Sequence, residues 1–283
     1  MMSASMTPSN PLNIYLGNRN LNPPEWTDFE WDDPLHGPQA KGEVAVIRPE
    51  GTSGNLAAGR WRTGYEIAGC EPDGSCRVKY SAPLGDETMV ILEGSARITE
   101  IATGRRHHIS AGSILSHPKH VDLYWEINRP FLKKFWVIWD SPVQGTREDH
   151  LYVAHINDNP PAWKPFGWVE PARGPEVCGE IHVIRDSGST GSYLCGLWRT
   201  GVGMAGCAPD GSGSIRYTSP RGDETVLLLE GQAQVVNEET GETHDLNGGD
   251  VIGLPAGLPV RWISKPPYVK TFRVITRATQ LAS

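Results

Sequence analysis

The sequence predicts an all-β protein made of two copies of one module, and three observations support this prediction. Glycine and proline are abundant, with 32 and 23 of the 283 residues, which is typical of a chain with many turns. Short apolar runs recur between these turns, and no segment shows a sustained apolar period of 3.6 residues. Finally, the two halves of the chain match each other after a shift of 137 residues.

The repeat extends without a gap from residues 14–140 to residues 151–277, and roughly two-fifths of the paired positions are identical. Blocks such as Trp61-Arg62-Thr63-Gly64 recur intact, here as Trp198-Arg199-Thr200-Gly201. The polar segment between the copies is interpreted as a connector. We therefore divide the chain into a flexible N-terminal tail (1–13), a first repeat (14–140), a linker (141–150) and a second repeat (151–283).

Charge and composition exclude several classes of partner. The net charge of −7 comes without a basic stripe, so we expect neither nucleic acid nor an anionic membrane surface as a partner. The chain has no apolar run of the roughly 18 to 20 residues that a membrane span requires, and its first residues lack the features of a signal peptide. We expect a cytoplasmic protein. Its five cysteines show no CxxC spacing, which favours reduced thiols over zinc ligands or disulfides.

Two short motifs identify a family resemblance. A Glu followed after six residues by Gly occurs in both repeats, whereas Gly, five residues, Pro, one residue and Gly is complete in the second repeat only. The residues are Glu87, Gly94, Gly112 and Pro118 in the first repeat, where His120 replaces the last Gly, and Glu224, Gly231, Gly249, Pro255 and Gly257 in the second. The chain resembles the cupins. This resemblance implies a bicupin: two RmlC-like jelly-roll barrels, or double-stranded β-helices, in tandem.

The chain is most similar to the Cupin_3 (DUF861) group, which includes ethanolamine utilization protein Q and (S)-ureidoglycine aminohydrolase. The similarity lies in the Leu-Glu-Gly turn after each motif Glu, in Gly249-Asp250 and in Trp262. The first repeat keeps a Trp at the matching position, Trp125, but has Ser113 in place of the Asp. This resemblance implies a metal-dependent hydrolase as one candidate function.

The metal ligands of catalytic cupins are not present at the corresponding positions. Such cupins hold their metal with two His from one strand, a Glu from the next, and a His from the second motif, because these side chains converge inside the barrel. The matching positions hold Tyr80, Ala82 and Leu123 in the first repeat and Tyr217, Ser219 and Val260 in the second, so only Glu87 and Glu224 remain. We therefore expect neither a metal nor another cofactor.

Four histidines cluster in the first repeat: His107, His108, His117 and His120. His117 and His120 are expected in the proline loop, and His107 on the outside of the barrel after a hairpin. Solvated or loop histidines are the favoured interpretation, and metal binding by this cluster stays open.

The polar and aromatic residues that recur in both repeats form the candidate site. We predict Glu87 and Glu224 as catalytic acid–base groups, since a carboxylate walled by aromatic side chains is suited to proton transfer. The predicted substrate-binding residues are Tyr80, Trp125 and Lys133 in the first repeat and Tyr217, Trp262 and Lys270 in the second. The alternative is that Glu and Lys form a buried ion pair that only stabilises the barrel.

Aromatic arms precede each barrel, with Trp26, Phe29 and Trp31 repeated as Trp163, Phe166 and Trp168. We expect them to pack across a neighbouring barrel, in the same chain or in another subunit of a homodimer or higher homo-oligomer. Three functions stay open. They are a metal-independent enzyme or binder for a small anionic or carbonyl-bearing metabolite, a metal-dependent hydrolase similar to ureidoglycine aminohydrolase, and a non-catalytic module for oligomerisation or ligand sensing.

Overall fold

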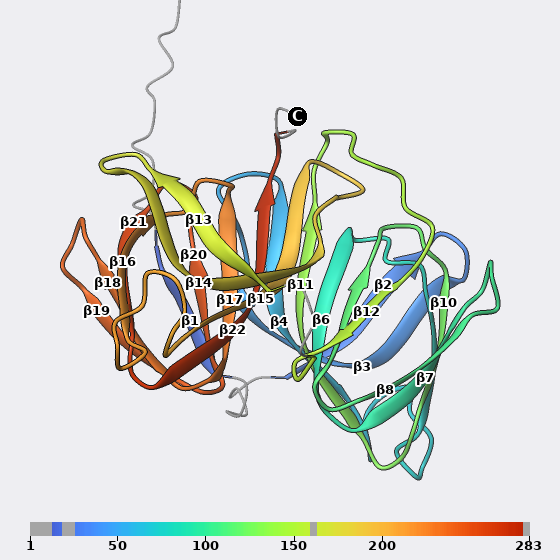
Figure 1. Ribbon diagram of the computed structural model, residues 1–283. Helices are drawn as coiled ribbons and strands as arrows, with labels where there is room; N and C mark the ends of the chain where they lie inside the picture. Colours follow the sequence, from blue (N-terminus) through green and yellow to red (C-terminus); the bar gives the residue numbers. More distant parts are fainter. Residues whose placement is uncertain (1–12, 19–25, 159–162, 280–283) are drawn as a thin grey trace, which may run out of the picture.

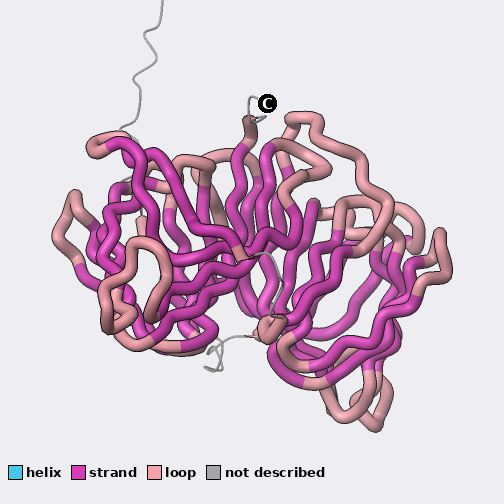
Figure 2. The backbone as a smooth tube through the Cα atoms, viewed as in Figure 1, coloured by secondary structure: helices cyan, strands magenta, loops and turns pink. Residues whose placement is uncertain are grey.

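The computed structural model describes residues 13–18, 26–158 and 163–279, and within these ranges it contains 22 strands and no helix (Figure 2). The predicted tail at 1–13 falls outside the described residues except for its last position. The strands of the first repeat are β1 (Tyr15–Asn18), β2 (Thr27–Asp33), β3 (Gly37–Arg48), β4 (Asn55–Thr63), β5 (Cys76–Tyr80), β6 (Asp86–Glu93), β7 (Ser95–Glu100), β8 (Arg106–Ser110), β9 (Ser113–His117), β10 (Leu123–Ile127) and β11 (Leu132–Asp140).

The second repeat follows the same order. Its strands are β12 (Tyr152–His155), β13 (Lys164–Glu170), β14 (Gly174–Arg185), β15 (Ser192–Gly201), β16 (Gly213–Thr218), β17 (Asp223–Glu230), β18 (Gln232–Asn237), β19 (Thr243–Asn247), β20 (Asp250–Leu254), β21 (Pro259–Ser264) and β22 (Tyr268–Arg277). The all-β prediction is confirmed. No helix in the described part of the chain is long and apolar enough to cross a membrane.

Each barrel is a sandwich of a seven-stranded and a four-stranded sheet, and the two barrels lie side by side (Figure 1). In the first barrel the large sheet has the order β12-β9-β6-β11-β4-β3-β2 and the small sheet the order β5-β10-β7-β8. In the second barrel the orders are β1-β20-β17-β22-β15-β14-β13 and β16-β21-β18-β19. This is the predicted tandem jelly-roll arrangement.

The first strand of each repeat joins the other repeat's barrel. β1 pairs with β20, with Tyr15 opposite Gly253, and β12 pairs with β9, with Tyr152 opposite Ser116. The exchange is reciprocal, so each large sheet contains the first strand of the other repeat. The units of sequence and the units of structure therefore differ at their N-terminal ends, and the predicted domain boundaries stay a prediction.

Three apolar cores hold the fold together: one inside each barrel and one between the two large sheets. Strand β11 contributes to two of them because its side chains alternate between faces. Trp136 points into the first barrel, whereas Phe135 and Val137 belong to the core between the barrels. There the Phe135 and Phe272 rings meet edge to face, 6.5 Å apart between centroids. This alternation decides which β11 side chains reach the interior.

Buried arginines also connect the barrels. Arg48 on β3 reaches the second barrel, where its guanidinium pairs with Asp223 at 2.9 Å and donates to the carbonyl of Glu224 at 3.0 Å. The equivalent Arg185 on β14 reaches the first barrel and pairs with Asp86 at 3.1 Å. Both guanidiniums are almost fully buried. Each Asp immediately precedes the motif Glu of its barrel, so the connection between barrels runs directly beside both candidate sites.

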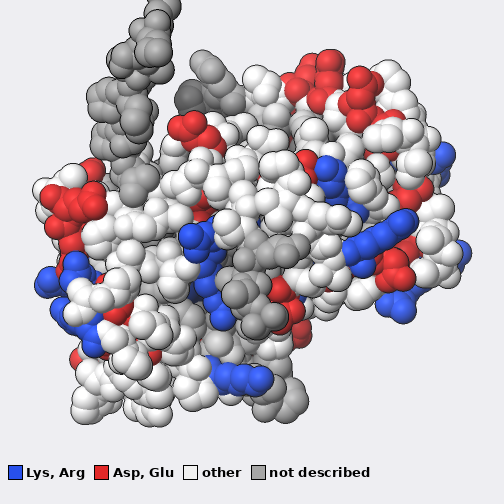
Figure 3. All heavy atoms as spheres, turned by 90° about the horizontal axis from the view of Figure 1, so that it is seen from above, with Lys and Arg blue, Asp and Glu red and all other residues white. Residues whose placement is uncertain are grey.

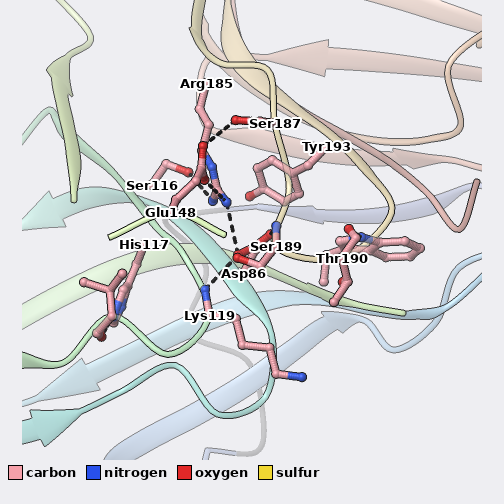
Figure 4. Close-up of polar contacts among 12 residues, drawn as sticks. Asp86, Ser116, His117, Lys119, Glu148, Arg185, Ser187, Ser189, Thr190 and Tyr193 are labelled. Carbon is pink, nitrogen blue, oxygen red and sulfur yellow. Dashed lines mark hydrogen bonds and ion pairs between the residues drawn. The ribbon is translucent and has the colours of Figure 1, made fainter. Parts of the chain in front are cut away.

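Figure 4 shows the surroundings of Arg185. Its guanidinium also pairs with Glu148, a residue of the segment between the repeats. The backbone N–H and hydroxyl of Ser189 donate to Asp86 at 2.7 and 2.6 Å. Asp86 is thus held by a guanidinium and two further donors from the second repeat, which compensates its burial.

A glycine sets the start of the strand that carries Glu87. Gly85 has φ +136°, and a Cβ at this position would lie 2.1 Å from the carbonyl oxygen of Trp139. Gly222 occupies the same place in the second repeat with φ +138° and the same close approach to Thr276. Only glycine fits such a conformation and such a contact.

Candidate functional site

The interior of the first barrel contains a cavity beside Glu87. The cavity has a volume of about 40 Å³, and the space is about 490 Å³ when the open mouth is included. The lining is aromatic and aliphatic except for three polar side chains. The lining residues are Phe29, Trp31, Val44, Trp61, Val78, Tyr80, Glu87, Trp125, Lys134, Trp136 and Ile138.

A buried ion pair forms the polar part of this cavity. The Lys134 ammonium donates to the Glu87 carboxylate at 2.6 Å, and both side chains are at most 10% exposed. The same ammonium lies 5.1 Å from the ring centre of Trp61 and 5.4 Å from that of Trp125. Cation–π attraction to the two rings therefore adds to the ion pair in fixing the ammonium.

Tyr80 faces the ion pair from the small sheet. Its hydroxyl makes no hydrogen bond of normal geometry with any described residue. Burial, followed by the negative charge of Glu87, raises the pKa of Tyr80 well above its ordinary value. The phenol is therefore neutral and lies beside the Glu87 carboxylate.

His117 lies behind Tyr80, with ring centroids 5.6 Å apart. Its Nε2–H donates to the carbonyl of Val121 at 2.6 Å, which leaves Nδ1 as the unprotonated nitrogen. Complete burial lowers the pKa of His117 to about 4. The imidazole is therefore neutral at pH 7. Its position corrects the sequence prediction, since His117 is the last residue of β9 and fully buried, not part of an exposed loop.

The second barrel has the same plan but much less space. Its cavity has a volume of only about 10 Å³, and the space is about 270 Å³ when the open mouth is included. Glu224 pairs with Arg273 at 2.9 Å, and this guanidinium lies 4.9 Å from the ring centre of Trp198. Arg273 stands where the first repeat has Trp136. The cation that pairs with the motif Glu therefore comes from a different position of the last strand in each barrel.

Of the predicted site residues, Glu87, Tyr80 and Trp125 line the first cavity, and Glu224, Tyr217 and Trp262 line the second. Burial, followed by the charge of Glu224, also raises the pKa of Tyr217. The structure thus brings together the carboxylate, the phenol and the indole of each set. Whether these residues bind or convert a ligand stays a prediction.

The two predicted lysines are elsewhere, and this placement is corrected. Lys133 approaches the largely exposed Glu93 at 3.5 Å, and Lys270 approaches Glu230 at 3.7 Å. Neither is among the residues that line the two interior cavities. The reason is strand parity, because side chains one residue apart point to opposite faces. Lys134 takes the predicted role in the first barrel.

The placement of the aromatic arms is also corrected. Strand β2 pairs with β3 of its own repeat, and Phe29 and Trp31 line the cavity of their own barrel instead of crossing to a neighbour. Their rings are stacked, with centroids 5.0 Å apart. The signal that could have found them was the repetition of both aromatics in the second copy, where Phe166 also lines the cavity.

The donor set does not fit the metal of catalytic cupins. Among the described residues, no three His, Cys, Asp or Glu side chains converge. The Glu87 carboxylate is already bound by Lys134, and the positions of the lost histidines carry a phenol and apolar side chains. Of the remaining clustered histidines, His107 pairs with Glu100 at 2.7 Å and His120 is exposed.

A wider cleft with a volume of about 500 Å³ lies outside the first barrel. Lys119 and His120, from the loop in which His120 replaces the motif Gly, line it together with Gln144, Arg147 and other residues of the linker. Its charges are mixed. Acidic and basic side chains also alternate over the face of the molecule seen in Figure 3, and the described residues drawn there form no broad basic area.

The fold is that of a two-barrel cupin. Residues 198–272, within the second repeat, match the family model of the EutQ-like cupin domain, Cupin_3. The predicted resemblance to this type of cupin is therefore confirmed. No curated protein matches the chain in sequence.

Similar solved structures agree with this class. A DUF861-family protein of unknown function from Pseudomonas syringae pv. tomato has a TM-score of 0.62 and 17% identity, covering 94% of this chain and 100% of that chain. Protein Ylba from E. coli, also of the DUF861 family, has a TM-score of 0.56 and 11% identity, with 97% of both chains covered. A variant of Bacillus subtilis oxalate decarboxylase has a TM-score of 0.52 and 13% identity, covering 98% of this chain and 80% of that chain. At these identities the likeness shows the fold alone.

Proposed function

We propose that the first barrel binds a small carbonyl compound or carboxylate among its aromatic side chains, and that Glu87 performs acid–base chemistry on it. The observation that supports this proposal is the buried Glu87–Lys134 pair beside an open cavity. Lining of this kind, largely apolar with a few convergent polar groups, is typical of small-molecule sites.

The chemistry follows from the three polar groups. The Lys134 ammonium and the Tyr80 hydroxyl are hydrogen-bond donors, so both suit the carbonyl or carboxylate oxygen of a ligand. With that oxygen polarised, the Glu87 carboxylate accepts a proton from the adjacent carbon, and the electron pair of the C–H bond moves toward the oxygen. Return of the proton to the same or a neighbouring atom completes an exchange or an isomerisation.

Aromatic side chains determine the kind of ligand. Trp31, Trp61, Trp125 and Trp136 offer ring faces and edges on several sides of the cavity, which suits a planar or apolar body. The limited space suits a molecule of few heavy atoms. We therefore favour short 2-oxo acids and aldehydes that carry a C–H bond on the carbon next to the carbonyl.

A ligand screen by thermal unfolding tests binding. A compound that binds only the native state raises the unfolding midpoint, and at 100 times its Kd the stabilisation is about 2.7 kcal/mol. The matched control is Lys134→Thr combined with Trp136→Arg, which gives the first barrel the residues of the second. This variant should unfold cooperatively and no longer respond to the ligand.

Proton exchange tests the chemistry separately. In D2O, deuterium should enter the carbon next to the carbonyl of a bound compound, as followed by NMR. Glu87→Gln should slow this exchange by roughly 100-fold or more while binding persists. Glu224→Gln is the control and should leave the rate unchanged. If ligands bind but wild-type protein catalyses no exchange, the barrel is a binding module and the acid–base part of the proposal fails.

A further inference from the structure

Each repeat contains a pair of neighbouring cysteines, although the sequence repeat explains only one member of each pair. Cys70 and Cys207 are equivalent positions. Their partners are Cys76 in the first repeat and Cys178 in the second, which are not equivalent to each other. The same arrangement of two thiols therefore arises in two different ways.

In the first repeat a tight turn places the pair. The backbone N–H of Glu71 donates to the carbonyl of Ser75 at 2.8 Å, so Cys70 and Cys76 are the next residues on either side of this closing contact. Opposite residues of antiparallel segments have Cα atoms about 4.5–5.5 Å apart, within the range that a disulfide spans. A hydrogen bond between the two thiols lowers the pKa of Cys70 to about 6 and raises that of Cys76.

In the second repeat the same turn is closed by Ala208 and Ser212 at 2.8 Å, but the residue opposite Cys207 is Gly213. The room left by the missing side chain is used by Cys178 from strand β14. Its Sγ lies 3.0 Å from where a Cβ of Gly213 would be. Burial, together with the neighbouring Cys207, raises the pKa of Cys178 to about 12. A thiol from another strand thus takes the place of the absent one.

We propose that Cys70–Cys76 and Cys178–Cys207 are redox-active dithiol pairs that a low-molecular-weight disulfide such as oxidised glutathione converts to intrachain disulfides. In the first repeat, the Cys70 thiolate attacks oxidised glutathione, forming a mixed disulfide and releasing one glutathione thiolate. The Cys76 sulfur then attacks the Cys70 sulfur and displaces the second glutathione. The protein loses two electrons and two protons, and oxidised glutathione becomes two molecules of glutathione.

The order of attack follows from the surroundings of each thiol. Cys70 is partly exposed and has the lower pKa, so it reacts first, and the buried Cys76 resolves the mixed disulfide. In the second repeat Cys207 is the partly exposed member and Cys178 the buried one. The fifth cysteine, Cys195, is completely buried in the core between the barrels and serves as an internal reference.

Peptide mapping of the full-length protein tests the proposal. Protein treated with oxidised glutathione is denatured, alkylated and digested with trypsin. Peptide 63–77 should then contain an internal disulfide, peptide 174–185 should be linked to peptide 200–216, and peptide 186–199 with Cys195 should be alkylated. Dithiothreitol before alkylation should remove both bridges.

Variants separate bridging from simple thiol modification. Cys76→Ala should leave glutathione attached to Cys70, because the resolving thiol is absent, whereas Cys70→Ala should leave Cys76 unmodified. Cys195→Ala is the control and should retain both bridges. Persistent glutathione on Cys70 of the wild-type protein, bridges that involve Cys195 or a second chain, or five unmodified cysteines would each overturn the proposal.

Discussion

Arg48 and Asp223 form an ion pair between the two repeats with a distance of 2.9 Å, and both side chains are almost fully buried. The equivalent residues in the opposite direction, Arg185 and Asp86, form the reciprocal pair at 3.1 Å. The two pairs hold the large sheets together at the point where each candidate site begins. Four expectations about stability follow from this and other buried contacts.

Arg48→Met should destabilise the protein by about 3–5 kcal/mol, because it leaves the Asp223 carboxylate buried without its cation. Urea unfolding measures the change. The control is Arg261→Met, since the pair between Arg261 and Glu238 is exposed at the arginine and should contribute about 0–1 kcal/mol. A loss below 1 kcal/mol for Arg48→Met would show that the pair does not hold the barrels together.

The Glu87–Lys134 pair should be needed by the fold only as a pair. Lys134→Met leaves the Glu87 carboxylate buried alone and should cost about 3–5 kcal/mol, whereas Glu87→Leu with Lys134→Met should be close to neutral. Thermal and urea unfolding of both variants measure this. If the double variant is as unstable as the single one, the pair has a structural role that the proposed function does not require.

His117 should make stability depend on pH. Its pKa is near 6.5 in the unfolded chain and about 4 in the folded protein, so between these values the unfolded state binds more protons. Stability from this group is complete above pH 6.5 and is lost as the pH falls to 4, by an amount on the order of 3 kcal/mol. Asp86 and Glu87 raise this pKa, whereas Lys134 and burial lower it.

The test compares His117→Leu, which introduces the residue of the second repeat at this position, with the wild type. The difference in unfolding free energy between the two proteins should change by the amount above from pH 6.5 to pH 4. The control is His120→Gly at the exposed loop position, which should follow the wild type. A constant difference between His117→Leu and wild type across this range contradicts the prediction.

Gly85→Ala should destabilise the protein by about 3 kcal/mol or more, since it combines an unfavourable φ with a clash against the Trp139 carbonyl. Gly104→Ala is the matched control, because Gly104 also has positive φ but has open space around its Cα. The control should cost only about 1 kcal/mol. Equal losses for the two variants would mean that the close approach to Trp139 has no effect.

The sequence predicted the all-β tandem fold and some of the residues that line the first cavity. Repetition and motif spacing identified Glu87, and strand alternation identified Tyr80 and Trp125 as interior residues. The lysine was missed for a physical reason. The repeat favoured Lys133, which has a counterpart in Lys270, but the regular alternation of β11 turns Lys134 into the first barrel together with Trp136. Lys134 has no such counterpart, because the second repeat has Thr271 at this position.

His117 and the exchanged strands were beyond sequence reasoning for different reasons. The proline motif predicted a loop at His117, whereas strand β9 continues through this residue because Glu87 pairs with it. The short strands at Tyr15 and Tyr152 have the same apolar pattern whichever barrel they join. Which partner they choose depends on the three-dimensional arrangement of two complete barrels.

The exchange of β1 and β12 links the two barrels within one chain. Strand β9 of the first repeat has its edge partner in β12 of the second, and β20 of the second repeat has its partner in β1 of the first. Neither large sheet is therefore complete without the other repeat, which is the relationship between the protomers of a domain-swapped dimer. A cut in the linker that separated the repeats would remove one edge strand from each large sheet.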